Sequence, residues 1–181
     1  MTEAILSTVD LTRRFGGLVA VSKVSVDLRV GEVHAVIGPN GAGKTTLTNL
    51  LSGDLAPTSG EIRYAGADLA GLPSHRISRM GIGRSYQKTN IFLPFSVFEN
   101  CRLAAQSRTP HAWRAFSRAP GFRDINRQAE AAMEAAGLAR RRDRVAATLS
   151  HGEQRQLEIA MCLATRPRVL LLDEPLAGMG P

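Results

Sequence analysis

The segment most diagnostic of the fold reads Gly38-Pro39-Asn40-Gly41-Ala42-Gly43-Lys44-Thr45. It matches the pattern G-x-x-x-x-G-K-[ST], which average residue usage would produce in under about 1% of chains of this length. Glycines let successive main-chain N–H groups turn inward around an anion, and a helix that follows adds its positive end. The segment therefore predicts a loop that binds nucleotide phosphates. Lys44 would bring its charge to the β- and γ-phosphates, Thr45 its hydroxyl to Mg²⁺, and Thr46 a bond to a phosphate oxygen.

The sequence on either side of this loop has the patterns of strands and of a helix. Apolar and polar residues alternate over 24–30, which is typical of a half-buried strand. Residues 33–37 form a short apolar run, which predicts a strand buried on both faces. The pattern after the loop predicts a helix over 44–52 that ends at Gly53, and a short strand at 61–64.

Farther along the chain the pattern becomes helical. A short helix is predicted at 73–80 and a strand at 82–86, and helical periodicity then extends over about 96–165. Within 122–136 the apolar residues recur on one helix face, which predicts that this face is buried. These residues are Ile125, Ala129, Ala132, Met133 and Ala136.

Two acidic residues, Asp173 and Glu174, follow the apolar run Val169–Leu172, which begins shortly after the helix-ending Pro167. The run predicts a buried parallel strand, and ligands of α/β sheets bind at the carboxyl ends of such strands. Asp173 would hold Mg²⁺ through its water shell, and Glu174 would orient and deprotonate an attacking water. Strands often end in acidic residues, so the pair points to catalysis only because the phosphate-binding loop accompanies it.

A second diagnostic segment reads Leu149-Ser150-His151-Gly152-Glu153-Gln154. Ser150 followed three residues later by Glu153 is a capping box, which predicts the start of a helix. The segment also resembles the signature loop of ABC ATPases, whose usual form is Leu-Ser-Gly-Gly-Gln. Both interpretations hold together, because a capped helix N-terminus offers N–H groups and a hydroxyl to an anion.

The resemblance to ABC ATPases implies that the bound nucleotide is ATP with Mg²⁺. It implies that Ser150, Gly152 and Glu153 cover the γ-phosphate of an ATP held by a second subunit. Gln87 resembles the glutamine of the family's glutamine loop, which contacts Mg²⁺ and the attacking water. Phe15 lies where the family keeps an aromatic ring that stacks on adenine, and a core phenylalanine at a strand edge is the alternative.

The resemblance covers essentially the whole chain and implies an α/β fold, a P-loop NTPase of ABC type. This fold has a mostly parallel core sheet, an antiparallel β subdomain and a helical subdomain, here expected at about 88–163. Residues 1–181 would form a single nucleotide-binding domain. The expected catalytic residues are Lys44, Gln87 and Glu174, and the expected Mg²⁺ ligands are Thr45, Gln87 and Asp173.

More narrowly, the chain resembles the ATPase subunits of branched-chain amino acid importers. The features shared are His151 and Glu153 in the signature, the run 176–181, and the long helical stretch 107–137. Importers of urea or other amides would look similar. The resemblance implies a second ABC ATPase subunit, identical or related, together with integral-membrane permease subunits and, indirectly, a solute-binding protein. The ATPase would be peripheral, at the cytoplasmic face of the inner membrane.

The groove that meets the permease would lie near Gln87. Four apolar residues would help line it, with core packing as the alternative: Ile91, Phe92, Phe95 and Phe98.

Composition limits the partners. The net charge is +7, and the densest basic run is Arg140–Arg144. A solvated turn is expected there, with lipid headgroups as the alternative, and no nucleic acid is expected because no aromatic residues interleave with the run. No run of eighteen apolar residues occurs and the N-terminus has no secretory pattern.

Cys101 and Cys162 are expected to be reduced thiols in packed helices.

Two alternatives remain open at this stage: a soluble ABC ATPase of DNA repair or translation, and a catalytically inactive, truncated ATP-binding fragment. The family has a histidine beyond the acidic pair that contacts the γ-phosphate, and no histidine follows Glu174 in this chain. The chain is therefore expected to be truncated at its C-terminus, to bind ATP weakly, to hydrolyse it poorly and to aggregate.

Overall fold

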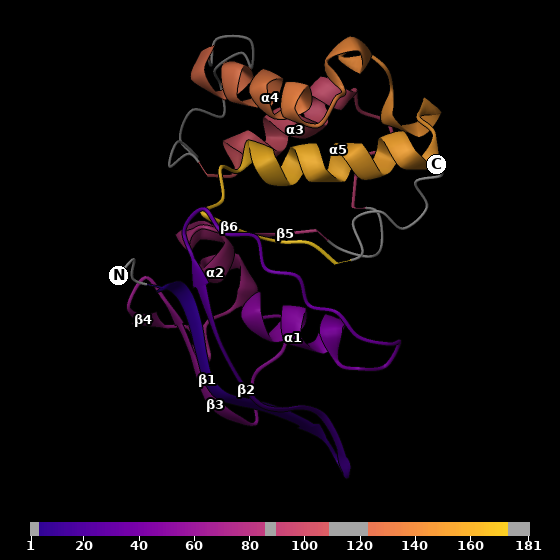
Figure 1. Ribbon diagram of the computed structural model, residues 1–181. Coiled ribbons are helices and arrows are strands. Elements are labelled where there is room, and N and C mark those ends of the chain that lie inside the picture. The colour runs from indigo at the N-terminus through magenta and orange to yellow at the C-terminus, as the bar shows by residue number, and fades with distance from the viewer. Residues whose placement is uncertain (1–3, 86–89, 109–122, 174–181) are drawn as a thin grey trace. The chain divides into compact units, whose positions relative to one another are not determined.

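The computed structural model describes residues 4–85, 90–108 and 123–173 of the 181-residue chain. The chain divides into two compact units, Met1–Ile82 and Gly83–Pro181 (Figure 1). No helix in the described part of the chain has the length and apolar character needed to cross a lipid bilayer.

The first unit is built on an antiparallel sheet of four strands in the order β2-β1-β3-β4 (Figure 1). The strands are β1 (Ala4–Phe15), β2 (Leu18–Arg29), β3 (Ser59–Tyr64) and β4 (Ala67–Asp68). Leu6, Leu11, Ile62 and Tyr64 are buried. Ile62 and Tyr64 alternate along β3 and so share one face, whereas β1 has a register shift between Thr8 and Leu11, which lets Leu6 and Leu11 both be buried although they are five residues apart. The expected antiparallel β subdomain is confirmed.

Two helices accompany this sheet. α1 (Lys44–Leu51) begins directly after the glycine-rich segment and buries Leu47, Leu50 and Leu51. Its C-cap is Ser52, followed by Gly53, whose φ of +76° favours glycine, and α2 (Ser74–Met80) packs Ile77 beside that glycine. Both helices agree with the sequence prediction.

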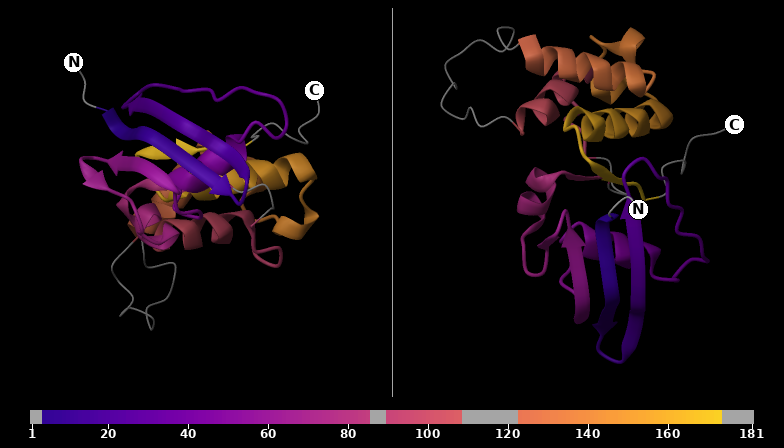
Figure 2. Two further views of the ribbon diagram at one scale, coloured as in Figure 1. Left: turned by 90° about the horizontal axis from the view of Figure 1, so that it is seen from below. Right: turned by 60° about the vertical axis from the view of Figure 1, so that its left-hand side comes forward.

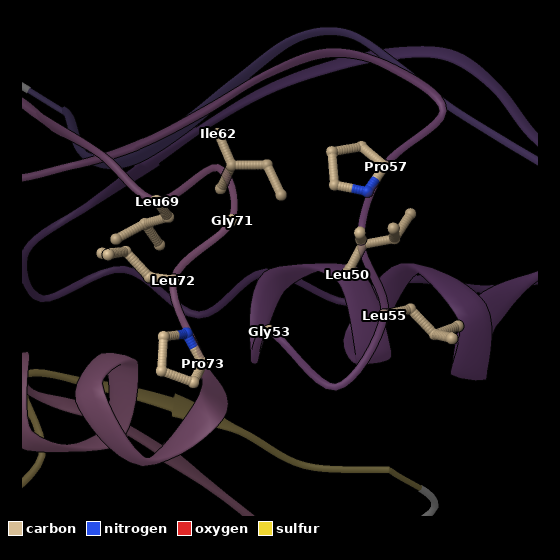
Figure 3. A pocket seen from close by; sticks show the side chains of 10 residues that line it. Leu50, Gly53, Leu55, Pro57, Ile62, Leu69, Gly71, Leu72 and Pro73 are labelled. Carbon is tan, nitrogen blue, oxygen red and sulfur yellow. The ribbon is translucent and has the colours of Figure 1, made fainter.

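An apolar pocket of about 230 Å³ lies beside the C-terminal end of α1 (Figure 3). Leu50, Ile62 and Leu72 are among the residues that line it, and none of its lining residues is charged. Because it offers no charge to an anion and lies at the opposite end of α1 from Lys44, it is not the phosphate site.

The segment 33–37 corrects the sequence prediction. It was expected to be a strand buried on both faces, but it has no strand structure, and Val33 and Ile37 are 98% and 92% exposed. None of the strand pairings of the described residues includes it. An apolar run becomes a strand only where a neighbour takes up its N–H and C=O groups, and that neighbour is not visible in a one-dimensional pattern.

The second unit is organised around three helices that lie side by side (Figures 1 and 2). They are α3 (Val97–Gln106), α4 (Arg123–Ala135) and α5 (His151–Ala164), with the short helices η3 (Ala139–Arg141) and η4 (Ala146–Thr148) between the last two. α4 buries Ile125, Ala129, Ala132 and Met133, so the predicted apolar face is confirmed, and Ala136 packs half-buried beside it.

A two-stranded sheet of β5 (Ile82–Arg84) and β6 (Val169–Leu171) accompanies these helices. Gly83 permits a close approach, because a Cβ atom there would lie 2.9 Å from the Cβ of Pro167. β6 is only half-buried and Leu172 is 39% exposed, so the prediction of a fully buried strand was wrong.

The basic run is more structured than the predicted solvated turn. Arg141 binds Glu153 at 2.8 Å, and the Arg142 guanidinium lies 4.0 Å from the ring centroid of Phe98. Cys101 in α3 and Cys162 in α5 are unpaired thiols, as predicted. Burial raises the pKa of Cys101 to about 12 and that of Cys162 to about 11.

Candidate functional site

The glycine-rich loop has the backbone geometry of an anion-binding nest. Gly41 and Gly43 have φ of +81° and +88°, and the N–H of Ala42 donates to the Pro39 carbonyl at 3.2 Å. A Cβ atom on Gly43 would collide with the Ala20 carbonyl oxygen of β2, so glycine is required by both conformation and space. Pro39, Asn40, Gly41 and Ala42 are exposed, and Gly38 is half-buried.

Lys44 is folded back over this loop. Its Nζ donates to the carbonyl oxygens of Gly38 at 2.7 Å and of Pro39 at 2.9 Å. Neither a side-chain cap nor an acidic residue occupies the first turn of α1, so its N–H groups and helix dipole face the loop without a competing carboxylate. Thr45 and Thr46 lie half-buried in that first turn. Loop, lysine and helix end together form a positively polarised cradle suited to phosphate.

The signature segment starts α5 with a complete capping box. The Ser150 Oγ accepts from the N–H of Glu153 at 3.3 Å, and a Glu153 carboxylate oxygen accepts from the N–H of Ser150 at 2.9 Å. That N–H bond lowers the pKa of the Glu153 carboxyl, burial opposes the shift, and Arg141 adds to the lowering. A Cβ atom on Gly152 would meet no described atom within 4 Å, so the first turn has open space beside it.

Asp173 is held by its main chain and leaves one carboxylate oxygen unpaired. Its N–H donates to the buried Ser85 Oγ at 3.3 Å, and its carbonyl accepts from Arg155 at 2.7 Å. The side chain is 5% exposed, and Oδ2 is buried with no hydrogen-bond partner among the described residues. A buried carboxylate oxygen in this state fits a hard cation such as Mg²⁺.

Sequence reasoning missed the pair that stands behind Asp173. Arg155 and Glu158 on α5 form an ion pair at 2.6 Å, with side chains 11% and 5% exposed. Their spacing of three residues is the available signal, but the same spacing is common on solvated helix surfaces. Only the tertiary structure shows that this pair is buried.

The phosphate-binding loop and the signature segment indicate a family, and comparison of the sequence with family profiles identifies it. The profile of the family described as ABC transporter matches residues 21–177. The chain belongs to the ABC transporter family. Its members' ATP-binding subunits are ATPases coupled to transport, and this chain is an ABC ATPase that binds ATP.

Known relatives resemble this ABC ATPase along its whole length. The branched-chain amino acid transport ATP-binding protein BraF of Pseudomonas aeruginosa is 44% identical, over 100% of the chain and 73% of BraF. The corresponding protein LivG of Escherichia coli K12 is 41% identical, with the same coverage. A solved ATP-binding cassette of an ABC transporter, MJ1267, matches with a TM-score of 0.83 at 29% identity, over 99% of this chain and 72% of that one. The predicted P-loop NTPase fold of ABC type is thereby confirmed.

Of the remaining predicted site residues of the ABC ATPase, the structure describes Phe15, whereas Gln87 and Glu174 lie outside the described residues. Phe15, at the end of β1, is 44% exposed, which argues against a core role, and the Arg13 guanidinium lies 4.6 Å from its ring centroid. Lys44 and the loop belong to the first compact unit, whereas Ser150 and Asp173 belong to the second.

Proposed function

We propose that this chain is the ATP-hydrolysing subunit of an ABC importer for branched-chain or other amino acids, and that ATP-driven closure of two such subunits powers permease subunits. The observation that carries the proposal is the cradle of the glycine-rich loop, Lys44 and the uncapped start of α1. The names of BraF and LivG, at 44% and 41% identity, support the substrate class.

In this proposal the loop binds the triphosphate of ATP. Main-chain N–H groups of the loop after Pro39 would surround the phosphates, and Thr46 would add a hydroxyl. The Lys44 ammonium, which bonds two carbonyl oxygens of the loop, would neutralise the β- and γ-phosphates. Phe15 would stack on the adenine through its exposed ring.

Hydrolysis would use the carboxylates at the end of β6. The unpaired Oδ2 of Asp173 fits Mg²⁺ held through water, with Thr45 and Gln87 as further ligands. Bound Mg²⁺ would neutralise charge that develops on the phosphate oxygens. Glu174 would accept a proton from the attacking water, which Gln87 helps to orient, and the products are ADP and phosphate.

The signature would act on a second subunit, identical or related. Ser150, Gly152 and Glu153 form the first turn of α5, where N–H groups and the Ser150 hydroxyl can meet an anion. Although the Ser150 Oγ accepts from Glu153, its own proton is still able to donate to a γ-phosphate. Two ATP molecules, each between one loop and the partner's signature, would close the pair, and hydrolysis would reopen it.

The permease would bind near an apolar surface of the second unit. Phe92 and Phe95 are 51% and 41% exposed and stack with ring centroids 5.6 Å apart, whereas Ile91 and Phe98 pack half-buried against the helical core. The exposed pair therefore suits contact with a permease, whereas Ile91 and Phe98 belong to the packing of the helical core. The ATPase would sit at the cytoplasmic face of the inner membrane, with a solute-binding protein as an indirect partner.

The binding step is tested by titrating the chain with Mg·ATP in a calorimeter. We expect saturable binding for the wild type and at least about a 100-fold loss for Lys44→Ala, because the lysine bonds charged phosphate oxygens. Arg63→Met, which removes a surface charge paired with Glu61, is the control and should bind like the wild type. Binding that is indifferent to Lys44→Ala would refute the site.

The transport step needs the complete system. Membrane vesicles carrying the co-expressed permease and binding protein should accumulate radiolabelled leucine only with ATP, and not when the subunit carries Lys44→Ala. Uptake of urea but not leucine would reject the amino-acid assignment while leaving the ATPase assignment intact.

A further inference from the structure

One face of α5 contacts three separate chain segments of the second unit. Arg155, Glu158 and Cys162 follow one another at spacings of three and four residues, so they lie on the same side of the helix. Arg155 bonds the carbonyl of Asp173 at 2.7 Å, Glu158 accepts from the N–H of Asn90 at 2.9 Å, and the Cys162 thiol donates to the carbonyl of Arg84 at 3.0 Å. This helix therefore carries a row of polar anchors on its inner side.

The two charged members of the row satisfy each other inside the protein. Arg155 is 11% exposed and Glu158 5%, and their bond is 2.6 Å long. Taking two ions out of water is costly unless further hydrogen bonds accompany the pair. Such further bonds join the pair to main-chain groups of Asp173 and Asn90. The planar guanidinium holds Glu158 and Asp173 at once, which a lysine ammonium would do less rigidly.

The consequence for Asp173 is that its backbone is fixed on both sides of its side chain. Ser85 accepts from the Asp173 N–H and Arg155 donates to the Asp173 carbonyl. The side chain itself keeps Oδ2 buried and unpaired within the described structure. The backbone from which the carboxylate projects is therefore held by two main-chain hydrogen bonds, and Arg155 supplies one of the two.

We propose that the Arg155–Glu158 pair is a positioning device that holds Asp173 in place for the metal and ties it to the helix that begins at Ser150. The inference rests on the proposed role of Asp173 in holding Mg²⁺. Arg155 lies five residues after Ser150 on one rigid helix, so a shift of the signature segment reaches the Asp173 carbonyl directly. Glu158 extends the same link to Asn90, which is separated by only two residues from the glutamine loop's Gln87.

The proposal predicts that loss of Arg155 weakens the contribution of the metal to nucleotide binding and leaves metal-free nucleotide binding intact. For the full chain, nucleotide affinity is measured by fluorescence titration with ATP in EDTA and again with Mn²⁺·ATP. The affinity for Mn²⁺·ATP divided by the affinity for ATP in EDTA reports how much the metal contributes to binding. Removing groups that orient a metal ligand lowers metal affinity by about 10–100-fold, so we expect Arg155→Met to lower this ratio by about tenfold. The affinity for ATP in EDTA should stay within about twofold, because the phosphate loop is untouched.

Two further variants separate positioning from stability. Arg155→Met combined with Glu158→Gln removes both charges of the pair and keeps an acceptor for the Asn90 N–H, so its melting temperature should recover toward that of the wild type. The affinity ratio should nevertheless stay low, because nothing holds the Asp173 carbonyl. Arg63→Met, which breaks the exposed pair with Glu61, should change neither quantity.

The outcomes are distinct. A ratio that is unchanged in Arg155→Met, or that recovers together with the melting temperature in the double variant, would overturn the positioning role and leave the ATPase intact. Failure of the wild type to bind either nucleotide form would instead overturn the proposed function on which this inference rests. If Arg155→Met does not fold, the charge-balanced double variant and Arg155→Lys carry the same measurement.

Discussion

Gly43 and Gly41 show how strictly individual residues are constrained in the phosphate-binding loop. Both have positive φ, but only Gly43 lies against another strand, with the Ala20 carbonyl where a Cβ atom would go. A Cβ atom on Gly41 would meet no described atom within 4 Å. The two positions therefore separate the cost of the backbone conformation from the cost of a steric clash.

We predict that Gly41→Ala destabilises the chain by about 1 kcal/mol, the cost of a left-handed conformation for a residue with a Cβ. Gly43→Ala should cost about 2–4 kcal/mol, because overpacking adds to the same conformational cost. Urea unfolding followed by circular dichroism measures both. Equal losses for the two variants would show that the contact with Ala20 does not constrain the loop.

The two thiols are predicted to be unreactive at neutral pH. Burial raises the pKa of Cys101 to about 12 and of Cys162 to about 11, and the thiolate is the reactive form. At pH 8 the thiolate fraction of Cys162 is about one in a thousand, so labelling with Ellman's reagent should be slow until urea unfolds the chain. Rapid labelling of the folded chain at pH 8 would contradict the raised pKa of at least one of the two thiols.

At the scale of elements, α5 links the signature to the end of β6. Its capping box satisfies the first N–H groups of the helix, and its inner face anchors Asp173. Replacing Ser150 by alanine should cost about 1 kcal/mol of stability, as expected for a lost N-cap. The same helix start is proposed to meet the γ-phosphate across the dimer, so Ser150 serves local structure and function together.

The capping box also predicts a pH dependence. The pKa of Glu153 is lowered on folding, chiefly by the Ser150 N–H, so its contribution to stability is complete above its ordinary pKa of 4.5 and is lost as pH falls through the folded pKa. We therefore expect Glu153→Gln to lower the melting temperature at pH 7 and to have a smaller effect at pH 3. Thermal melts at the two pH values measure this, with Glu134→Gln on the exposed side of α4 as the control. An effect that grows toward pH 3 would have the wrong sign.

At the scale of the whole molecule, the residues of the proposed mechanism belong to two compact units. The phosphate loop belongs to the first, and the signature and Asp173 belong to the second. In the proposed function each ATP also needs the signature of another subunit, so nucleotide binding and association are linked.

We predict that Glu174→Gln, which removes the proposed base, accumulates a dimer with Mg·ATP. Sedimentation should give about twice the monomer mass with Mg·ATP and the monomer mass in EDTA, because a symmetric pair would enclose both nucleotides. Adding Ser150→Ala should weaken the dimer, and adding Lys44→Ala should abolish it. A Glu174→Gln chain that stays monomeric in Mg·ATP would contradict closure by the signature.

The sequence by itself determined the features that depend on neighbours along the chain. The loop before α1, the capping box at Ser150 and the buried face of α4 each follow from the conformations and spacings of a few adjacent residues, and all three agree with the structure. Long-range contacts were decided only by the tertiary structure. Residues 33–37 have the composition of a buried strand but are exposed, and Arg155 and Glu158 look like a surface pair but are buried against Asp173. Burial and strand pairing depend on which distant segments meet, and a local pattern of residues carries no information about that partner.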